Sequence, residues 1–162
     1  MAANADRYND PGKFTSFIGY EWTSWGREGS DGSEGRSNLH RVVVFKDGAS
    51  KAKQILPFSV FDSPNPEDLW RFFEDYQQKT GGDVLAIPHN GNLSNGEMFS
   101  LFDFEGRPIN QTYAKTRSRW EPLYEVTQTK GDAETHSILS PEDEFADYET
   151  WNSWNGKNMK GI

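Results

Sequence analysis

An apolar run that stops at a histidine is the feature that most constrains how this chain can fold. Residues 85–88 read Leu-Ala-Ile-Pro, and His89 then opens a polar stretch, Asn-Gly-Asn, at 90–92. Strands buried on both faces are nearly continuous in apolar residues, and in α/β folds the loops that follow such strands contain the functional residues. The run therefore predicts a buried strand with His89 at its carboxyl end, where a titratable side chain is a site candidate.

A helix is predicted directly before this strand. Asn65 and Pro66 are typical of an N-cap and a first helical position, and acidic side chains follow in the first turn, where the helix dipole favours them. Gly81 and Gly82 indicate where the helix ends. Apolar residues recur between them at helical spacing, at Leu69, Trp70, Phe72, Phe73 and Tyr76. This stripe predicts core packing, and the order of helix and strand is that of a βαβ unit in an α/β fold.

Three further strands are predicted from runs of aromatic and β-branched residues. The first covers 14–22 and ends near Glu21, the second covers 38–45 with His40 at its start, and the third covers 122–128 and includes Glu125. Taken singly, Glu21 could be a half-exposed strand residue and His40 a structural or solvated one. Both readings stay open at this point.

Two more helices are predicted outside this region. Residues 109–120 should form one with Tyr113 and Trp120 facing inward and its basic residues on a solvated face. Ser140 and Pro141, followed by acidic residues, should open the other.

Composition excludes several classes of function. The 162 residues suffice for one domain, and a 14% aromatic content can build its core. A net charge of −8 disfavours duplex nucleic acid as a partner. The lack of cysteine excludes thiolate metal sites but leaves histidine and carboxylate ligands available. No apolar run reaches the roughly 20 residues that a membrane span requires.

Four residues at predicted strand edges form a possible metal site: Glu21, His40, His89 and Glu125. In a barrel these edges would converge on one mouth. Two imidazoles with a carboxylate suit Zn, Mn or Fe, and a hydrolase would use such ions to lower the pKa of water and to bind a phosphoryl group. Spacing alone is weak support, because the chain contains neither an HxH nor an HExxH pair.

Several ordered motifs give the chain a family resemblance. They lie at 17–24 (FIGYEWTS), 38–45 (NLHRVVVF), 86–94 (AIPHNGNLS), 125–131 (EVTQTKG) and 140–146 (SPEDEFA). The chain resembles a large bacterial family that is named only as a domain of unknown function and is similar to the polymerase and histidinol phosphatase (PHP) superfamily of metal-dependent phosphoesterases. That resemblance implies a distorted (β/α)7 barrel with a centre of two or three metals. Glu21 would be the bridging glutamate, and His40 and His89 would be metal ligands.

Five other residues are candidates for supporting roles under the same resemblance. Asn90, Asn92, Glu125 and His136 could orient the ligands or contact the substrate. Arg41 could meet a substrate phosphate, although an ion pair at the surface is the simpler reading.

The chain also departs from the superfamily pattern, which begins with HxH and Asp-His motifs and ends with Asp-x-His. None of these occurs here. Residues 1–162 are therefore interpreted as a single incomplete PHP-like domain whose first and last strands are missing and whose metals are incompletely bound. The parent protein would hydrolyse a small-molecule phosphate ester with a metal-bound hydroxide, whereas the isolated chain would be inactive.

Two other functions remain open. Exposed aromatic residues at Trp25, Trp151 and Trp154 could form a ligand-binding module, or the fragment could have no activity of its own.

Overall fold

The computed structural model describes residues 2–27, 37–128, 131–132, 141–144 and 146, and these form a mixed α/β fold. Its elements are α1 (Ala2–Tyr8), β1 (Ile18–Trp22), β2 (Arg41–Phe45), α2 (Ala49–Ala52), α3 (Pro66–Thr80), β3 (Val84–Pro88), the short 3-10 helices η1 (Gly91–Leu93) and η2 (Glu97–Phe99), α4 (Gln111–Trp120), β4 (Thr127–Gln128) and β5 (Gly131–Asp132). Strands near the predicted runs at 14–22, 38–45 and 85–88 are therefore present.

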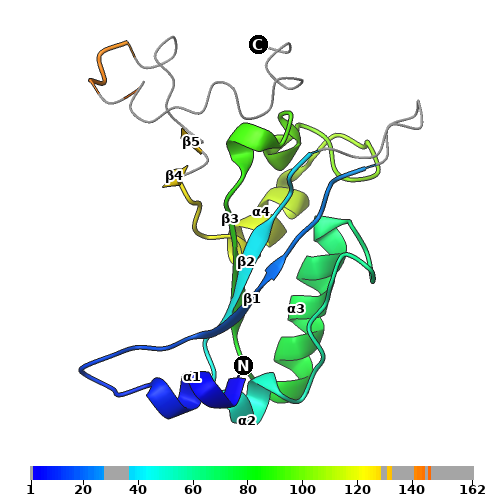
Figure 1. Cartoon of the computed structure of the whole chain (residues 1–162). Helices are drawn as coiled ribbons and strands as arrows, with labels where there is room; N and C mark the ends of the chain where they lie inside the picture. Colours follow the sequence, from blue (N-terminus) through cyan, green and yellow to red (C-terminus); the bar gives the residue numbers. More distant parts are fainter. Residues whose placement is uncertain (1, 28–36, 129–130, 133–140, 145, 147–162) are drawn as a thin grey trace.

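The main sheet is open and antiparallel, in the order β1-β2-β3. The prediction of a parallel βαβ unit is wrong, and no barrel is formed by the described residues. The reason lies in the connection between β2 and β3 (Figure 1). After α2 the chain runs back along the sheet through 53–64, so α3 starts at the end where β2 started, where the Ser24 hydroxyl donates to the Pro64 carbonyl at 2.8 Å. This additional pass reverses the direction of β3.

Helix α3 confirms the prediction made from its capping residues. The side chain of Asn65 accepts a hydrogen bond from the Glu67 amide at 2.8 Å, and Gly81 ends the helix in the left-handed conformation with φ 62°. A side chain other than glycine is strained at such a φ. The predicted apolar stripe is core, since Leu69, Trp70, Phe73 and Tyr76 are buried.

The core lies between one face of the sheet and the helices α3 and α4. Arg41, Val43 and Phe45 of β2 point to this inner face, and Trp22 and Ala86 from the neighbouring strands share it. Figure 1 shows α3 along the sheet, with α1 and α2 at the end of the sheet away from η1 and η2. The end near η1 and η2 is called the site end below.

Helix α4 agrees with its prediction except in one respect. Trp120 is buried and Tyr113 packs against the core, where burial raises the pKa of the Tyr113 phenol. However, Arg117 is not part of a solvated face, because its Nε lies 3.1 Å from the buried carboxylate of Glu121.

Two predictions near the carboxyl end are corrected. Residues 122–126 are not a strand, although the Glu125 amide donates to the Pro88 carbonyl at 3.1 Å; only Thr127–Gln128 forms one. The described residues 141–144 form turns instead of a helix, and Ser140 lies outside the described part of the chain. Within the described residues, no helix has the length and apolar character needed to cross a bilayer.

Candidate metal centre

The antiparallel sheet brings three chain segments together at its site end. Trp22, the last residue of β1, pairs with Arg41, the first of β2, and Arg41 pairs with Pro88, the last of β3. His40 therefore lies directly before β2 and His89 directly after β3. The His89 amide donates to the His40 carbonyl at 3.4 Å, which holds the two segments side by side.

Three of the four predicted ligands face one another at this end. Glu21, His40 and His89 each offer a ligand atom, and these atoms all lie within 4.8 Å of one another. His40 Nδ1 is 3.0 Å from Glu21 Oε1, and His89 Nε2 is 4.0 Å from Glu21 Oε2. The imidazole ring centroids are 5.9 Å apart at an angle of 72°. Each carboxylate oxygen of Glu21 thus faces a different imidazole.

The three side chains differ in exposure. Glu21 is 48% exposed, whereas His40 is 14% and His89 7% exposed. Glu21 Oε1 also accepts a hydrogen bond from the Thr23 hydroxyl at 2.9 Å. The cluster is therefore open to solvent on the Glu21 side and closed beneath the imidazoles.

The donor set fits a divalent transition metal. A tetrahedral ion with ligands at about 2.1 Å separates neighbouring donor atoms by about 3.4 Å, and the two nitrogen–oxygen distances of 3.0 and 4.0 Å lie on either side of that value. His89 Nδ1 lies 3.3 Å from the Ile87 carbonyl, so a proton on Nδ1 leaves Nε2 as the lone-pair donor toward Glu21. Metal-binding histidines commonly make such a bond through their other nitrogen.

The predicted supporting residues divide into two groups. Asn90 is fully buried beside His89; its Oδ1 accepts from Gln128 Nε2 at 3.0 Å, and its Nδ2 has no hydrogen-bond partner within the described part of the chain. Gln128 Nε2 also donates to the His89 carbonyl. Asn92 lies exposed in η1.

Two predicted carboxylate or imidazole groups are not in the cluster. Glu125 is partly buried near β3 but is not one of the facing ligand residues found among the described residues. His136 lies outside the described part of the chain.

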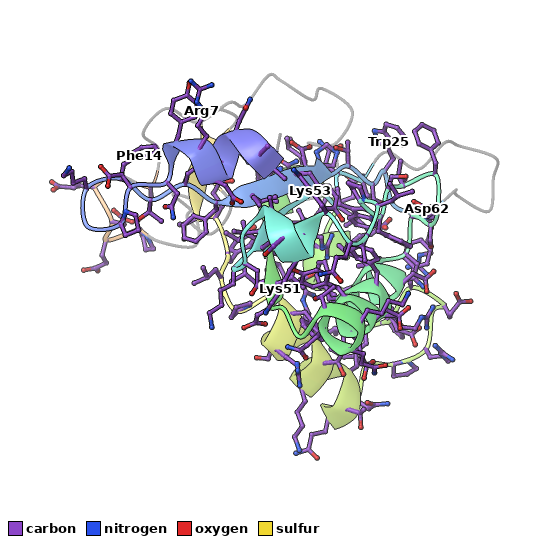
Figure 2. All side chains as sticks on the ribbon, turned by 90° about the horizontal axis from the view of Figure 1, so that it is seen from below. Arg7, Phe14, Trp25, Lys51, Lys53 and Asp62 are labelled. Atoms are coloured by element: carbon purple, nitrogen blue, oxygen red, sulfur yellow. The ribbon has the colours of Figure 1, made fainter. Side chains whose placement is uncertain are left out.

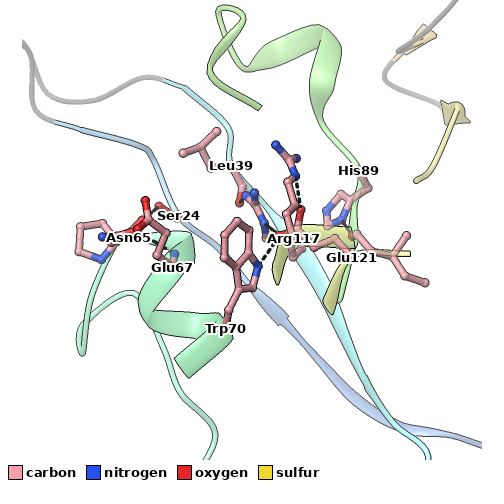
Figure 3. A network of polar contacts seen from close by, with 11 residues as sticks. Ser24, Leu39, Asn65, Glu67, Trp70, His89, Arg117 and Glu121 are labelled. Atoms are coloured by element: carbon pink, nitrogen blue, oxygen red, sulfur yellow. Dashed lines mark hydrogen bonds and ion pairs between the residues drawn. The ribbon is translucent and has the colours of Figure 1, made fainter. Parts of the chain in front are cut away.

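Arg41 does form an ion pair, but a buried one, so its assignment to a surface pair is wrong. Its Nε lies 2.8 Å from Glu121 Oε1, and both side chains are at most 2% exposed. The Trp70 indole N–H donates to the same oxygen at 2.9 Å, and Arg117 approaches the other oxygen (Figure 3). Arg41 Nη1 also donates to the Leu39 carbonyl. These residues form a buried network on the inner face of the site end.

Sequence reasoning missed Glu121 and Gln128. The spacing of four residues between Arg117 and Glu121 suits an ion pair on a helix, which is a weak signal because such pairs are usually at the surface. For Gln128 the chain offered no local signal, since its partners His89 and Asn90 are 39 and 38 positions away.

The alternative of an aromatic binding module gains no support from the described residues. Trp25 is 51% exposed and projects from the edge of the molecule (Figure 2). The other two tryptophans of that hypothesis, Trp151 and Trp154, lie outside the described part of the chain. Glu21 and His89, whose separation would have favoured the module, lie close together.

Fold and cluster together define a mixed α/β domain with a His-His-Glu group at one end of an open sheet. The chain belongs to the DUF3604 family, described as a protein of unknown function, whose model matches residues 1–161. No curated protein and no solved structure matches it.

Proposed function

We propose that this chain provides part of the metal centre of a hydrolase that acts on phosphate esters. The observation that supports this proposal is the convergence of Glu21, His40 and His89, which come from three separate segments and bring their ligand atoms within 4.8 Å of one another. Ion pairing alone would need only one of the two imidazoles. The second imidazole makes a group of three ligand side chains, which is the arrangement that a metal requires.

Each side chain has a distinct part in the proposed centre. His89 Nε2 and His40 Nδ1 would be the nitrogen donors, and Glu21 would supply the carboxylate, which turns one oxygen toward each imidazole. A bound Zn, Mn or Fe ion would supply Lewis acidity and lower the pKa of a water molecule. The exposure of Glu21 leaves the substrate a path from solvent, while the two less exposed imidazoles fix the direction of approach.

The proposal includes the finer fold assignment. We propose that the three strands form part of a PHP-like barrel. Successive partners Glu21, Val42 and Ile87 share the outer face of the sheet, opposite to α3. Val42 on that face is 38% exposed and Phe17 at its margin 62%. An apolar face of this kind is typical of a sheet that packs against further strands or helices.

Metal binding tests the ligand assignment directly. Zn²⁺ and Mn²⁺ should bind the 162-residue chain in isothermal titration calorimetry, and His89→Ala should lose more than the roughly 10–100-fold in affinity that removal of a supporting group costs. Glu74→Gln is the matched control, because it removes an exposed carboxylate of α3 outside the cluster. Equal affinity of His89→Ala and the unaltered chain would refute the assignment.

Hydrolysis needs a separate test, because three ligands supply only part of a centre with two or three metals. We expect little activity from the 162-residue chain. In a full-length family protein that contains it, hydrolysis of an aryl phosphate should depend on added metal and should be abolished by His89→Ala. Metal binding without phosphate ester hydrolysis in that protein would retain the metal centre and reject the substrate class.

A further inference from the structure

We infer that Arg41 and Glu121 are positioning residues that hold His40 in place for metal binding, an inference that rests on the proposed metal centre. His40 and Arg41 are neighbours in sequence at the start of β2, so their side chains point to opposite faces of the sheet. His40 faces Glu21 on the outer face, and Arg41 faces the core. Arg41 therefore acts on the cluster through the backbone instead of touching a metal or substrate.

The backbone around His40 depends on this guanidinium. His40 precedes the regular ladder of β2, whose pairing begins at Arg41. On its amino-terminal side, the Leu39 carbonyl accepts a hydrogen bond from Arg41 Nη1, and the Leu39 amide donates to the Ser24 carbonyl at 2.9 Å. The Arg41 side chain thus holds the peptide before His40. The pairing of Arg41 with Trp22 and Pro88 in the sheet holds the backbone after it.

The guanidinium is itself held by a carboxylate and by an aromatic ring. Glu121 Oε1 lies 2.8 Å from Arg41 Nε, and the Arg41 Cζ lies 5.6 Å from the centroid of the Trp22 ring. Glu121 in turn is fixed by Trp70 from α3 and by Arg117 from α4. The position of His40 is therefore linked to both helices that cover the sheet.

The energetics of the network favour a positioning role. Burial of an ion pair commonly contributes little to stability compared with apolar residues of similar size, because both charges lose their hydration. Here two guanidiniums surround one carboxylate, and Nη2 of Arg117 is buried with no hydrogen-bond partner in the described part of the chain. An arrangement with this surplus positive charge should add little stability, but it gives the guanidinium of Arg41 a single orientation.

The first test compares metal affinity with stability in matched variants of the 162-residue chain. Glu121→Gln keeps the size of the side chain but removes its charge, and Arg41→Lys keeps the charge but cannot reach both Glu121 and the Leu39 carbonyl. Both should bind Zn²⁺ about 10–100-fold more weakly. The control is Phe45→Leu, at the opposite end of β2 on the same inner face, where it contacts the Tyr76 ring. This variant should lose stability and keep its affinity for Zn²⁺.

A second readout observes His40 without metal. In protein labelled with ¹⁵N-histidine, the ring signals of His40, assigned from a His40→Gln spectrum, should shift and broaden in Glu121→Gln and not in Phe45→Leu. Unchanged affinity and unchanged His40 signals in Glu121→Gln and Arg41→Lys would overturn the inference, whatever their stability.

If the single variants fail to fold, a triple variant decides the question: Arg41→Met/Arg117→Met/Glu121→Leu. Its apolar replacements leave no buried charge unpaired. It should fold, bind Zn²⁺ weakly and show an altered His40 signal; normal binding would overturn the inference. If the unaltered chain binds no metal, the proposed function fails, and the His40 signals alone decide whether the network positions this imidazole.

Discussion

Two glutamates at the same end of the sheet have opposite surroundings. Glu121, on the inner face, is 1% exposed and is surrounded by two guanidiniums and an indole N–H. Glu21, on the outer face, is 48% exposed and faces two imidazoles. The partners of Glu121 are two permanent cations and an indole N–H, none of which has a lone pair to offer a metal, so they occupy its oxygens and exclude an ion. The partners of Glu21 can become metal ligands themselves, so only this carboxylate belongs to a site that could bind an ion.

The largest expected effect is a difference between the two carboxylates in how much each contributes to the free energy of unfolding. Glu121→Ala should lower the free energy of unfolding by about 3–5 kcal/mol, because it leaves two buried guanidiniums uncompensated. Glu21→Ala should lower it by less than about 1 kcal/mol, since an exposed ion pair contributes little. Urea unfolding of both variants measures the difference. Similar losses for the two would show that the contrast in burial has no energetic consequence.

A smaller effect is expected on the stability that a bound metal adds, which should depend on Glu21. With Zn²⁺ at 100 times its dissociation constant, the unaltered chain should gain about 2.7 kcal/mol of stability, the amount that binding to the folded state alone provides. Glu21→Gln should show no gain under the same conditions, and Glu74→Gln should retain the full gain. Thermal unfolding with and without the ion provides the measurement. A full gain in Glu21→Gln would mean that the ion binds elsewhere.

The smallest effect concerns a third carboxylate, Asp103, which has a fixed partner like Glu121 but lies in a turn near the surface. Burial alone would raise its pKa, but hydrogen bonds from Arg107 and Glu105 hold the pKa of Asp103 below its ordinary value of 3.8. Because the folded pKa is the lower one, the stabilisation is fully present above the ordinary value and is lost as the pH falls through the folded pKa.

Asp103→Asn supplies the control for this pH dependence. The stability difference between the unaltered chain and Asp103→Asn should be constant near neutral pH and should shrink below about pH 4. Urea unfolding from pH 7 to pH 2 tests this. A difference that grows on acidification would contradict the assigned direction of the pKa.

Local sequence signals predicted the elements whose stability is local. Asn65, Pro66 and Gly81 specify the ends of α3 through capping and backbone conformation, and the apolar stripe between them specifies its buried face. The residues at 122–128 show the limit of the same reasoning. Their composition predicted a short strand over 122–128, but only Thr127 and Gln128 form one, because the segment finds few backbone partners beyond the Pro88 carbonyl.

The structure brings Glu21, His40 and His89 together as predicted, but for a different geometric reason from the one expected. Glu21, His40 and His89 were grouped because each lies at a strand edge, and a parallel sheet was expected to bring them together. In a parallel sheet, however, the start of one strand and the end of the next lie at opposite ends. His40 meets His89 because β2 is antiparallel to both of its neighbours.

The sequence by itself determined the capped helix, the apolar strands and the residue types able to bind a metal, since these follow from local conformational preference and side-chain chemistry. Only the tertiary structure decided the direction of the strands, the burial of Arg41 and the pairing of Glu121 with residues up to 80 positions away. Those features depend on how the 53–64 segment returns along the sheet and on which charges meet in the core. Neither is encoded in a window of neighbouring residues.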